Sequence, residues 1–291
     1  MNYEVVNLNE SEATGILEVR KKKMPIFQDR LFKLAQGDSP FRAINDVMSS
    51  LIVKSIGNEA VDVKLAVLNQ RGEKKLGRLS EGVAMRGGIE ALVEPGDLSP
   101  FCHMELEYLP SPSKWKEGDF GMKRHLQFIN IKQALESLEF NVDSGGRYRL
   151  SHDYEEKFLR RYLSLITTMD FDTLWTHNNG QIVKKGKTDR ARLTINPGPF
   201  YDGEFMMHGF SKPLYIPEKN FDFLAKDYSH ILEGFADGLG VLEGNLEKIF
   251  DPGEVHLFAN ISQQEMQERF DDKRRGVERQ IVLLRDQMGV S

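Results

Sequence analysis

The sequence predicts an α+β fold, with mainly antiparallel sheets, helices on one face of them and a long C-terminal helix. Segments in which apolar and polar residues alternate follow one another in runs, and clean strand–helix–strand units are few. Helical periodicity is confined to a few longer segments. The chain has 291 residues, of which 40% are hydrophobic, so it can bury a large core without disulfides or metal.

The predicted strands begin near residue 61, because the first forty residues are charged and show no clear period. In residues 61–69, Val63 and Leu65 alternate with Asp62 and Lys64, and the polar stretch that follows is typical of a turn. Further strands are predicted at residues 82–93, 101–109, 125–131, 171–175, 181–187, 191–197, 204–210 and 254–261.

The longer helices are predicted from apolar residues three and four positions apart. They cover residues 41–56, 151–169, 218–240 and a terminal segment from about Ser262. Gly57 is placed to end the first helix, and Ser262 with Glu265 has the pattern of a capping box. Three glycines are expected to end the third helix and shape a turn: Gly238, Gly240 and Gly244.

We expect a strand-rich module at residues 1–144 and a second module at 145–291, with a single domain as the alternative. The stretch from Pro110 to Gly121 and the residues around Asn141 are rich in turn-forming residues. A chain of this length fits one large domain or two smaller ones.

Cysteine content and hydropathy predict a cytoplasmic protein. Cys102 is the only cysteine, so no disulfide can form within the chain, which fits a reducing compartment. The N-terminal residues lack the basic start and apolar run of a signal peptide. No segment approaches the roughly 18 apolar residues of a membrane span, so no membrane partner is expected.

Two glycine-containing stretches resemble nucleotide-binding loops only in part. Gly186-Lys187-Thr188 matches the end of a phosphate-binding loop, but five residues separate Gly180 from Gly186 where the motif needs four. Gly238, Gly240 and Gly244 follow a helical pattern, whereas a dinucleotide fingerprint lies between a strand and a helix. We therefore predict no cofactor.

Two groups of residues could serve a metal-dependent hydrolase. His103, Glu105 and Glu107 share one face of a predicted strand, and Asp62 and Lys64 share one face of another, downstream of Asp46. The alternative for each group is a solvated polar face of a half-buried strand. We favour that alternative and predict no metal site.

Basic residues crowd a predicted hairpin, whose turn is Asn179-Gly180, and the strand that follows it: Lys184, Lys185, Lys187, Arg190 and Arg192. Each such cation can neutralise a phosphate of DNA or RNA and release a counterion, which favours binding to the nucleic-acid backbone without sequence specificity. The alternative is an ordinary lysine-rich hairpin in contact with water.

The terminal helix carries apolar residues seven positions apart, at Phe270, Val277 and Leu284, with Ile281 and Met288 on the adjoining seam. This pattern predicts a homo-oligomer through a short coiled coil, with Arg274 as a polar position in its seam. A helix packed against its own domain would show the same pattern.

The leading hypothesis from the sequence is a non-catalytic cytoplasmic binding protein that self-associates and contacts nucleic acid. The first alternative is a metal-dependent, nuclease-like hydrolase that uses Asp62, Lys64 and Glu105 or Glu107. The second is a purely protein-binding or structural oligomeric subunit. The sequence leaves open whether the protein is an enzyme.

Overall fold

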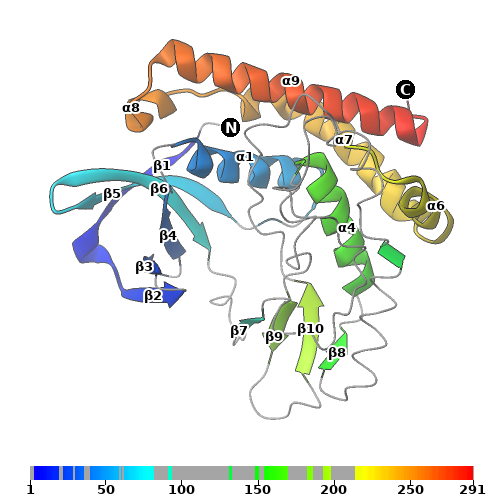
Figure 1. Ribbon diagram of the computed structural model, residues 1–291, viewed down its shortest axis with the longest axis horizontal. Helices are drawn as coiled ribbons and strands as arrows, with labels where there is room; N and C mark the ends of the chain where they lie inside the picture. Colours follow the sequence, from blue (N-terminus) through cyan, green and yellow to red (C-terminus); the bar gives the residue numbers. More distant parts are fainter. Residues whose placement is uncertain are drawn as a thin grey trace, which may run out of the picture.

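The predicted α+β class is confirmed by the computed structural model (Figure 1). The structure describes residues 3–19, 22–28, 30–35, 40–58, 60, 62–81, 91–93, 131–132, 148–150, 154–169, 182–185, 193–197 and 214–290. Within them, a six-stranded sheet and a smaller four-stranded sheet are accompanied by helices, and the longest helix is C-terminal. None of the helices described is both long and apolar enough to cross a membrane.

The six-stranded sheet is built from the N-terminal part of the chain. Its strands are β1 (Val5–Asn9), β2 (Gly15–Val19), β3 (Lys22–Phe27), β4 (Arg30–Leu34), β5 (Val63–Gln70) and β6 (Glu73–Glu81). They lie in the order β1-β5-β6-β4-β3-β2, and only the β1–β5 pair is parallel. Four of these strands come from the first forty residues, where the sequence showed no clear period.

The predicted turn after residue 69 is the tight connection between β5 and β6. Gln70 pairs with Glu73, so only Arg71 and Gly72 form the loop. Both residues have positive φ, 53° and 85°, as a two-residue type I′ hairpin requires. This turn matches the right-handed twist of the two strands that it joins.

The four-stranded sheet has the order β7-β9-β10-β8. Its strands are β7 (Ala91–Val93), β8 (Tyr148–Leu150), β9 (Ile182–Lys185) and β10 (Leu193–Pro197). β9 is antiparallel to both of its neighbours, whereas β10 and β8 are parallel. β9 is therefore an internal strand.

The predicted helix at residues 41–56 is α1 (Phe41–Ser55), which packs against β5 and β6. Its end follows the prediction: Gly57 has φ of 80°, and the Gly57 and Asn58 amides donate to Lys54 and Val53. That pair of hydrogen bonds is a Schellman motif. α1 is buried on nearly every side because other helices cover the face that the sheet does not.

The remaining helices are α4 (Tyr154–Thr167), α6 (Glu218–Asp227), α7 (Ser229–Ile249), α8 (Val255–Ala259) and α9 (Gln263–Met288). α9 starts where the sequence predicts, because the Ser262 hydroxyl accepts a hydrogen bond from the Glu265 amide at 3.1 Å. In Figure 1, α9 runs along α7 at the top of the molecule, and α4 descends beside the four-stranded sheet.

Two predictions about the C-terminal half are wrong. Residues 254–261 are not a strand, because α8 forms there and ends at Asn260 in the left-handed conformation. The glycines of α7 do not end it, since the helix continues to Ile249. Gly238 instead allows a close helix contact: a Cβ at this position would lie 2.5 Å from the Ile56 carbonyl oxygen.

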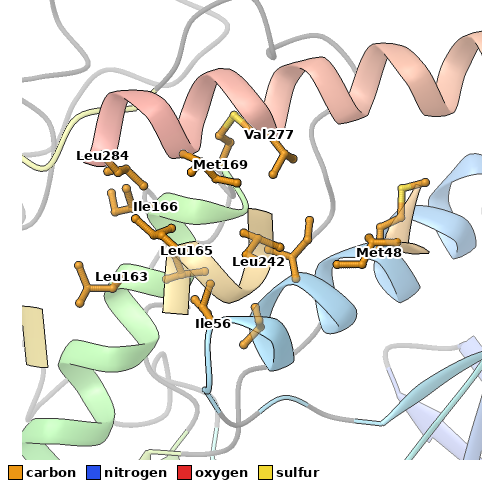
Figure 2. Packing of buried hydrophobic residues seen from close by; sticks show 14 of the residues in the cluster. Met48, Ile56, Leu163, Leu165, Ile166, Met169, Leu242, Val277 and Leu284 are labelled. Atoms are coloured by element: carbon orange, nitrogen blue, oxygen red, sulfur yellow. The ribbon is translucent and has the colours of Figure 1, made fainter. Parts of the chain in front are cut away.

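The main hydrophobic core lies where α1, α4, α7 and α9 meet. Figure 2 shows Ile56, the residue after α1, close to Leu242 of α7, with Ile166 of α4 and Val277 of α9 in the same cluster. Residues on both sides of position 145 contribute to this core. The division into modules 1–144 and 145–291 stays a prediction.

A second, smaller core lies on the other face of the six-stranded sheet. It is formed by Leu8, Phe27, Phe32, Ala66, Leu68 and Leu79. The Phe27 and Phe32 rings meet edge to face, with centroids 6.5 Å apart. Both faces of β5 are therefore buried along most of its length, and the polar face predicted for this strand is limited to its first residues.

Candidate functional site

Two of the five predicted phosphate-binding residues, Lys184 and Lys185, are in β9. Lys184 is in register with Ile195 of β10 and with Ala91 of β7, and Lys185 is in register with Thr194. β9 is thus antiparallel to the predicted strand that follows it, and the predicted turn at Asn179-Gly180 lies outside the described residues. β9 lies inside a four-stranded sheet rather than forming a separate two-stranded arm. Lys187, Arg190 and Arg192 lie outside the described residues.

Asp62, the proposed metal-binding carboxylate, is held by two cations. Its oxygens accept hydrogen bonds from Arg30 Nη1 and Lys54 Nζ, each at 2.9 Å. Partial burial acts to raise the pKa of Asp62, but the hydrogen bonds and charges of Lys54 and Arg30 outweigh it and lower that pKa. This arrangement is that of a carboxylate tying together β4, α1 and the start of β5.

The two described residues that were considered with Asp62, Lys64 and Asp46, have other partners. Lys64 Nζ contacts Glu4 Oε2 at 2.7 Å, and Asp46 is buried against Arg78. His103, Glu105 and Glu107 lie outside the described residues. No group of three metal-ligating side chains occurs in the part of the chain that the structure describes.

The heptad residues of the terminal helix pack in the hydrophobic core of the same chain. Phe270, Val277, Ile281 and Leu284 are all essentially inaccessible to water and belong to the main core. They pack against α4 and α7, so the seam predicted for a coiled coil has no room for a second helix. The coiled-coil prediction is therefore wrong for this seam, and the alternative of a helix packed on its own domain is the observed one.

The outward-facing side of α9 differs from the buried seam because it is open to water. Arg275, Glu278, Arg279, Val282, Leu283 and Asp286 line an open hollow of about 460 Å³, and we call this set the outer face of α9. Val282 has 57% of its surface exposed. Arg275 makes one weak intrahelical contact, with Asp272 at 3.5 Å. An apolar centre with charges of both signs around it thus faces outward.

Lys273 of α9 is buried, with 6% of its surface exposed. Burial lowers its pKa to about 8, with Asp272 acting against that change and Arg269 adding to it. Arg269 itself lies over the Phe41 ring, 4.3 Å from the centroid. Lys273 is thus part of the helix interface and is not placed for phosphate contacts.

One group of charged residues was not predicted from the sequence. Lys33, Arg42, Asp46 and Arg78 come from β4, α1 and β6 and line one small cavity. Arg42 and Asp46 are four residues apart on α1, but no spacing signal in the sequence links them to Lys33 or Arg78, which lie in two other elements. Only the pairing of β4 with β6 and the packing of α1 on the sheet bring them together.

Comparison with known proteins gives distant structural similarity alone. No protein-family model matches the chain, and no curated protein matches it. The kinase CtkA of Helicobacter pylori, described as proinflammatory, is 13% identical with a TM-score of 0.45, over 93% of this chain and 92% of that one. HipA of Shewanella oneidensis MR-1, solved with HipB and operator DNA, is 12% identical with a TM-score of 0.37, over 94% of this chain and 64% of that one.

Proposed function

We propose that this protein is a non-catalytic, cytoplasmic binding protein that contacts the phosphate backbone of nucleic acid and associates with a second copy of itself. The phosphate contacts are assigned to Lys184, Lys185, Lys187, Arg190 and Arg192. The contacts between copies are assigned to the outer face of α9.

The observation that supports the nucleic-acid part is the register of β9 with β10. Because Lys185 pairs with Thr194, the two ends of the segment that contains Lys187, Arg190 and Arg192 are neighbours. Lys184 and Lys185 stand at one of these ends. Five cations fall within nine residues of the sequence, which gives a local positive charge on a chain whose net charge is -5.

Such a cluster acts by releasing counterions from nucleic acid. Each neutralised phosphate adds about −0.9 to the slope of log affinity against log salt concentration on duplex DNA. Five contacts would give a slope of about −4 to −5, with no preference among sequences of equal length.

The test measures binding of labelled duplex DNA, single-stranded DNA and RNA over a range of salt concentrations. We expect K187E/R190E/R192E to weaken binding at least tenfold and to reduce the magnitude of the salt slope by about 3. The control is K74E/K219E/K226E, which reverses three exposed lysines elsewhere. Equal affinity of wild type and K187E/R190E/R192E would refute the assignment.

The same samples test the proposal that the protein is non-catalytic. Cleavage of the nucleic acid when magnesium is added, or consumption of ATP by the wild-type protein, would contradict it. Neither reaction should occur above the level of a buffer control.

Charge complementarity supports self-association through the outer face of α9. If two copies of α9 pair antiparallel about a point between residues 280 and 281, Arg275 meets the partner's Asp286 on both sides of the centre. Val282 and Leu283 then lie near the middle of the contact. One helix pair buries less than the roughly 800 Å² per partner of a standard interface, so the dimer should be weak.

A further inference from the structure

The basic end of the β9–β10 pair and the outer face of α9 lie on opposite sides of the molecule. Figure 1 shows α9 along the top edge, with α1, α4 and the four-stranded sheet all below it. The arrow of β10, which begins at Leu193, starts at the bottom of this view and points up toward the helices. Because Lys185 of β9 pairs with Thr194, β9 ends beside the start of β10. The end of the pair that carries Lys184 and Lys185 therefore points away from α9.

The outer face of α9 is turned away from the main core. Val277 and Leu284, on the inner side of the helix, pack in that core against α4 and α7. Val282, on the outer face, is 57% exposed, and Arg275 and Asp286 line the same open hollow. A second copy that binds this face is therefore separated from the four-stranded sheet by the helices of the main core (Figure 1).

Two-fold symmetry determines where the β9–β10 pair of the second copy lies. In an isologous dimer the symmetry axis runs through the interface, so a part that is remote from the interface in one copy is equally remote on the opposite side in the other. A folded chain of 291 residues has a radius of gyration of about 19 Å, which corresponds to a diameter of about 50 Å. The two basic ends of a dimer formed through α9 are thus on the order of 100 Å apart and face outward in opposite directions.

One short duplex is too small and too stiff to contact both basic ends. A duplex of about 20 base pairs is about 68 Å long, because each base pair adds about 3.4 Å. DNA resists bending over lengths of up to about 150 base pairs, so a short duplex does not wrap around the dimer. Each basic end is therefore left to hold a duplex of its own.

We infer that this protein bridges two separate duplexes of nucleic acid, one held at the β9–β10 end of each copy in a dimer formed through α9. The inference rests on the proposed function for these two contacts and adds the directions in which they face. The two duplexes need no sequence in common, because contacts to the phosphate backbone carry no sequence information.

The test measures whether the full chain holds two duplexes together. A biotin-labelled duplex of about 20 base pairs is fixed on beads, and a fluorescent duplex of the same length is added with the protein at concentrations at which it sediments as a dimer. We expect the wild type to retain the fluorescent duplex on the beads. Arg275→Asp should retain at least tenfold less, because it meets the partner copy's carboxylate at position 286, and R275D/D286R should restore retention.

The matched control is Lys248→Asp, which reverses an exposed cation of α7 outside the outer face of α9. This variant should bridge as the wild type does. Binding to a single duplex is measured for all four proteins by fluorescence anisotropy at low protein concentration. The affinities should be equal, because neither Arg275 nor Lys248 is among the residues assigned to phosphate.

The possible failures of bridging and of the proposed function are distinct. A wild-type protein that binds one duplex and sediments as a dimer, but retains no second duplex, would overturn bridging and leave the proposed function intact. Equal retention by the wild type and Arg275→Asp would also overturn it. A duplex of about 60 base pairs that the wild type binds at least tenfold more tightly than Arg275→Asp does would place both contacts on one duplex and exclude bridging. Failure to bind any duplex would refute the proposed function, and bridging with it.

Discussion

Gln280 of α9 pairs with the backbone of Leu214 as a neighbouring strand would. Its side-chain oxygen accepts from the Leu214 amide at 2.7 Å, and its side-chain nitrogen donates to the Leu214 carbonyl at 2.8 Å. Gln287, two turns further along α9, pairs in the same way with the amide and carbonyl of Ile216. Two glutamines thus fix the extended segment that enters α6, and both groups of the buried Leu214 backbone are satisfied.

Replacing Gln280 with alanine should lower the free energy of unfolding by about 2–4 kcal/mol, because a buried amide and a buried carbonyl lose their partners together. Urea denaturation followed by circular dichroism measures the change. Gln267→Ala on the exposed part of the same helix is the control, and we expect it to change stability by less than about 0.5 kcal/mol. Similar effects of the two substitutions would contradict the role given to Gln280.

Alanine substitutions at two glycines of α7 should change the stability of the protein in opposite directions. A Cβ at Gly238 would lie 2.5 Å from the Ile56 carbonyl oxygen, so Gly238→Ala must push α1 and α7 apart and should destabilise by about 2 kcal/mol or more. A Cβ at Gly244 would meet no atom within 4 Å, and Gly244→Ala should stabilise by about 0.5–1 kcal/mol through helix propensity. Thermal unfolding of the two variants provides the comparison, and equal shifts would rule out a close contact at Gly238.

Burial of Lys273 should make stability depend on pH above neutrality. Its folded pKa is lowered to about 8, whereas an unfolded lysine titrates near 10.4, so the unfolded chain binds more protons between these values. Stability therefore rises with pH in that window, by up to about 1.4 kcal/mol per pH unit from this group. The destabilisation that comes from burying the charged Lys273 side chain is fully present below pH 8.

The measurement is the difference in unfolding free energy between wild type and Lys273→Met, from pH 7 to 9.5. Lys273→Met removes the charge, so the stability advantage of the variant should shrink as the pH rises. Above pH 10 the tyrosines also titrate in the unfolded chain, and their raised folded pKa values, as for Tyr162, lower the stability of both proteins alike. Parallel pH profiles of the two proteins would show that Lys273 is charged in the folded state throughout.

Self-association through α9 should depend on the charges of its outer face. Arg275→Asp places a carboxylate against the partner's Asp286 and should weaken the dimer at least tenfold, and R275D/D286R should restore it. Val282→Asp should also weaken the dimer, by placing a charge near its centre. Sedimentation equilibrium at high protein concentration detects each change. A wild-type protein that is monomeric at every concentration would exclude this interface.

The sequence by itself determined the elements whose signals are local. The periodicity of α1, α4 and α9 predicted these helices, and Gly57 and Ser262 acted as their end signals, because helix hydrogen bonds and caps join residues a few positions apart. The strands β5, β9 and β10 were predicted from local alternation and composition in the same way.

Only the tertiary structure decided which helices, strands and side chains contact one another. The strands β1 and β4 are only partly buried, so burial imposes no regular alternation on them, and pairing with β5 and β6 fixes their place in the sheet; the first forty residues therefore gave no strand signal. The heptad pattern of α9 predicted an apolar stripe, but not that α4 and α7 of the same chain would cover it. Gly238 lies at a close contact between helices and not at a helix end. The cavity lined by Lys33, Arg42 and Arg78 exists because strand pairing and helix packing unite residues that are distant along the chain, and such long-range contacts leave no spacing signal in the sequence.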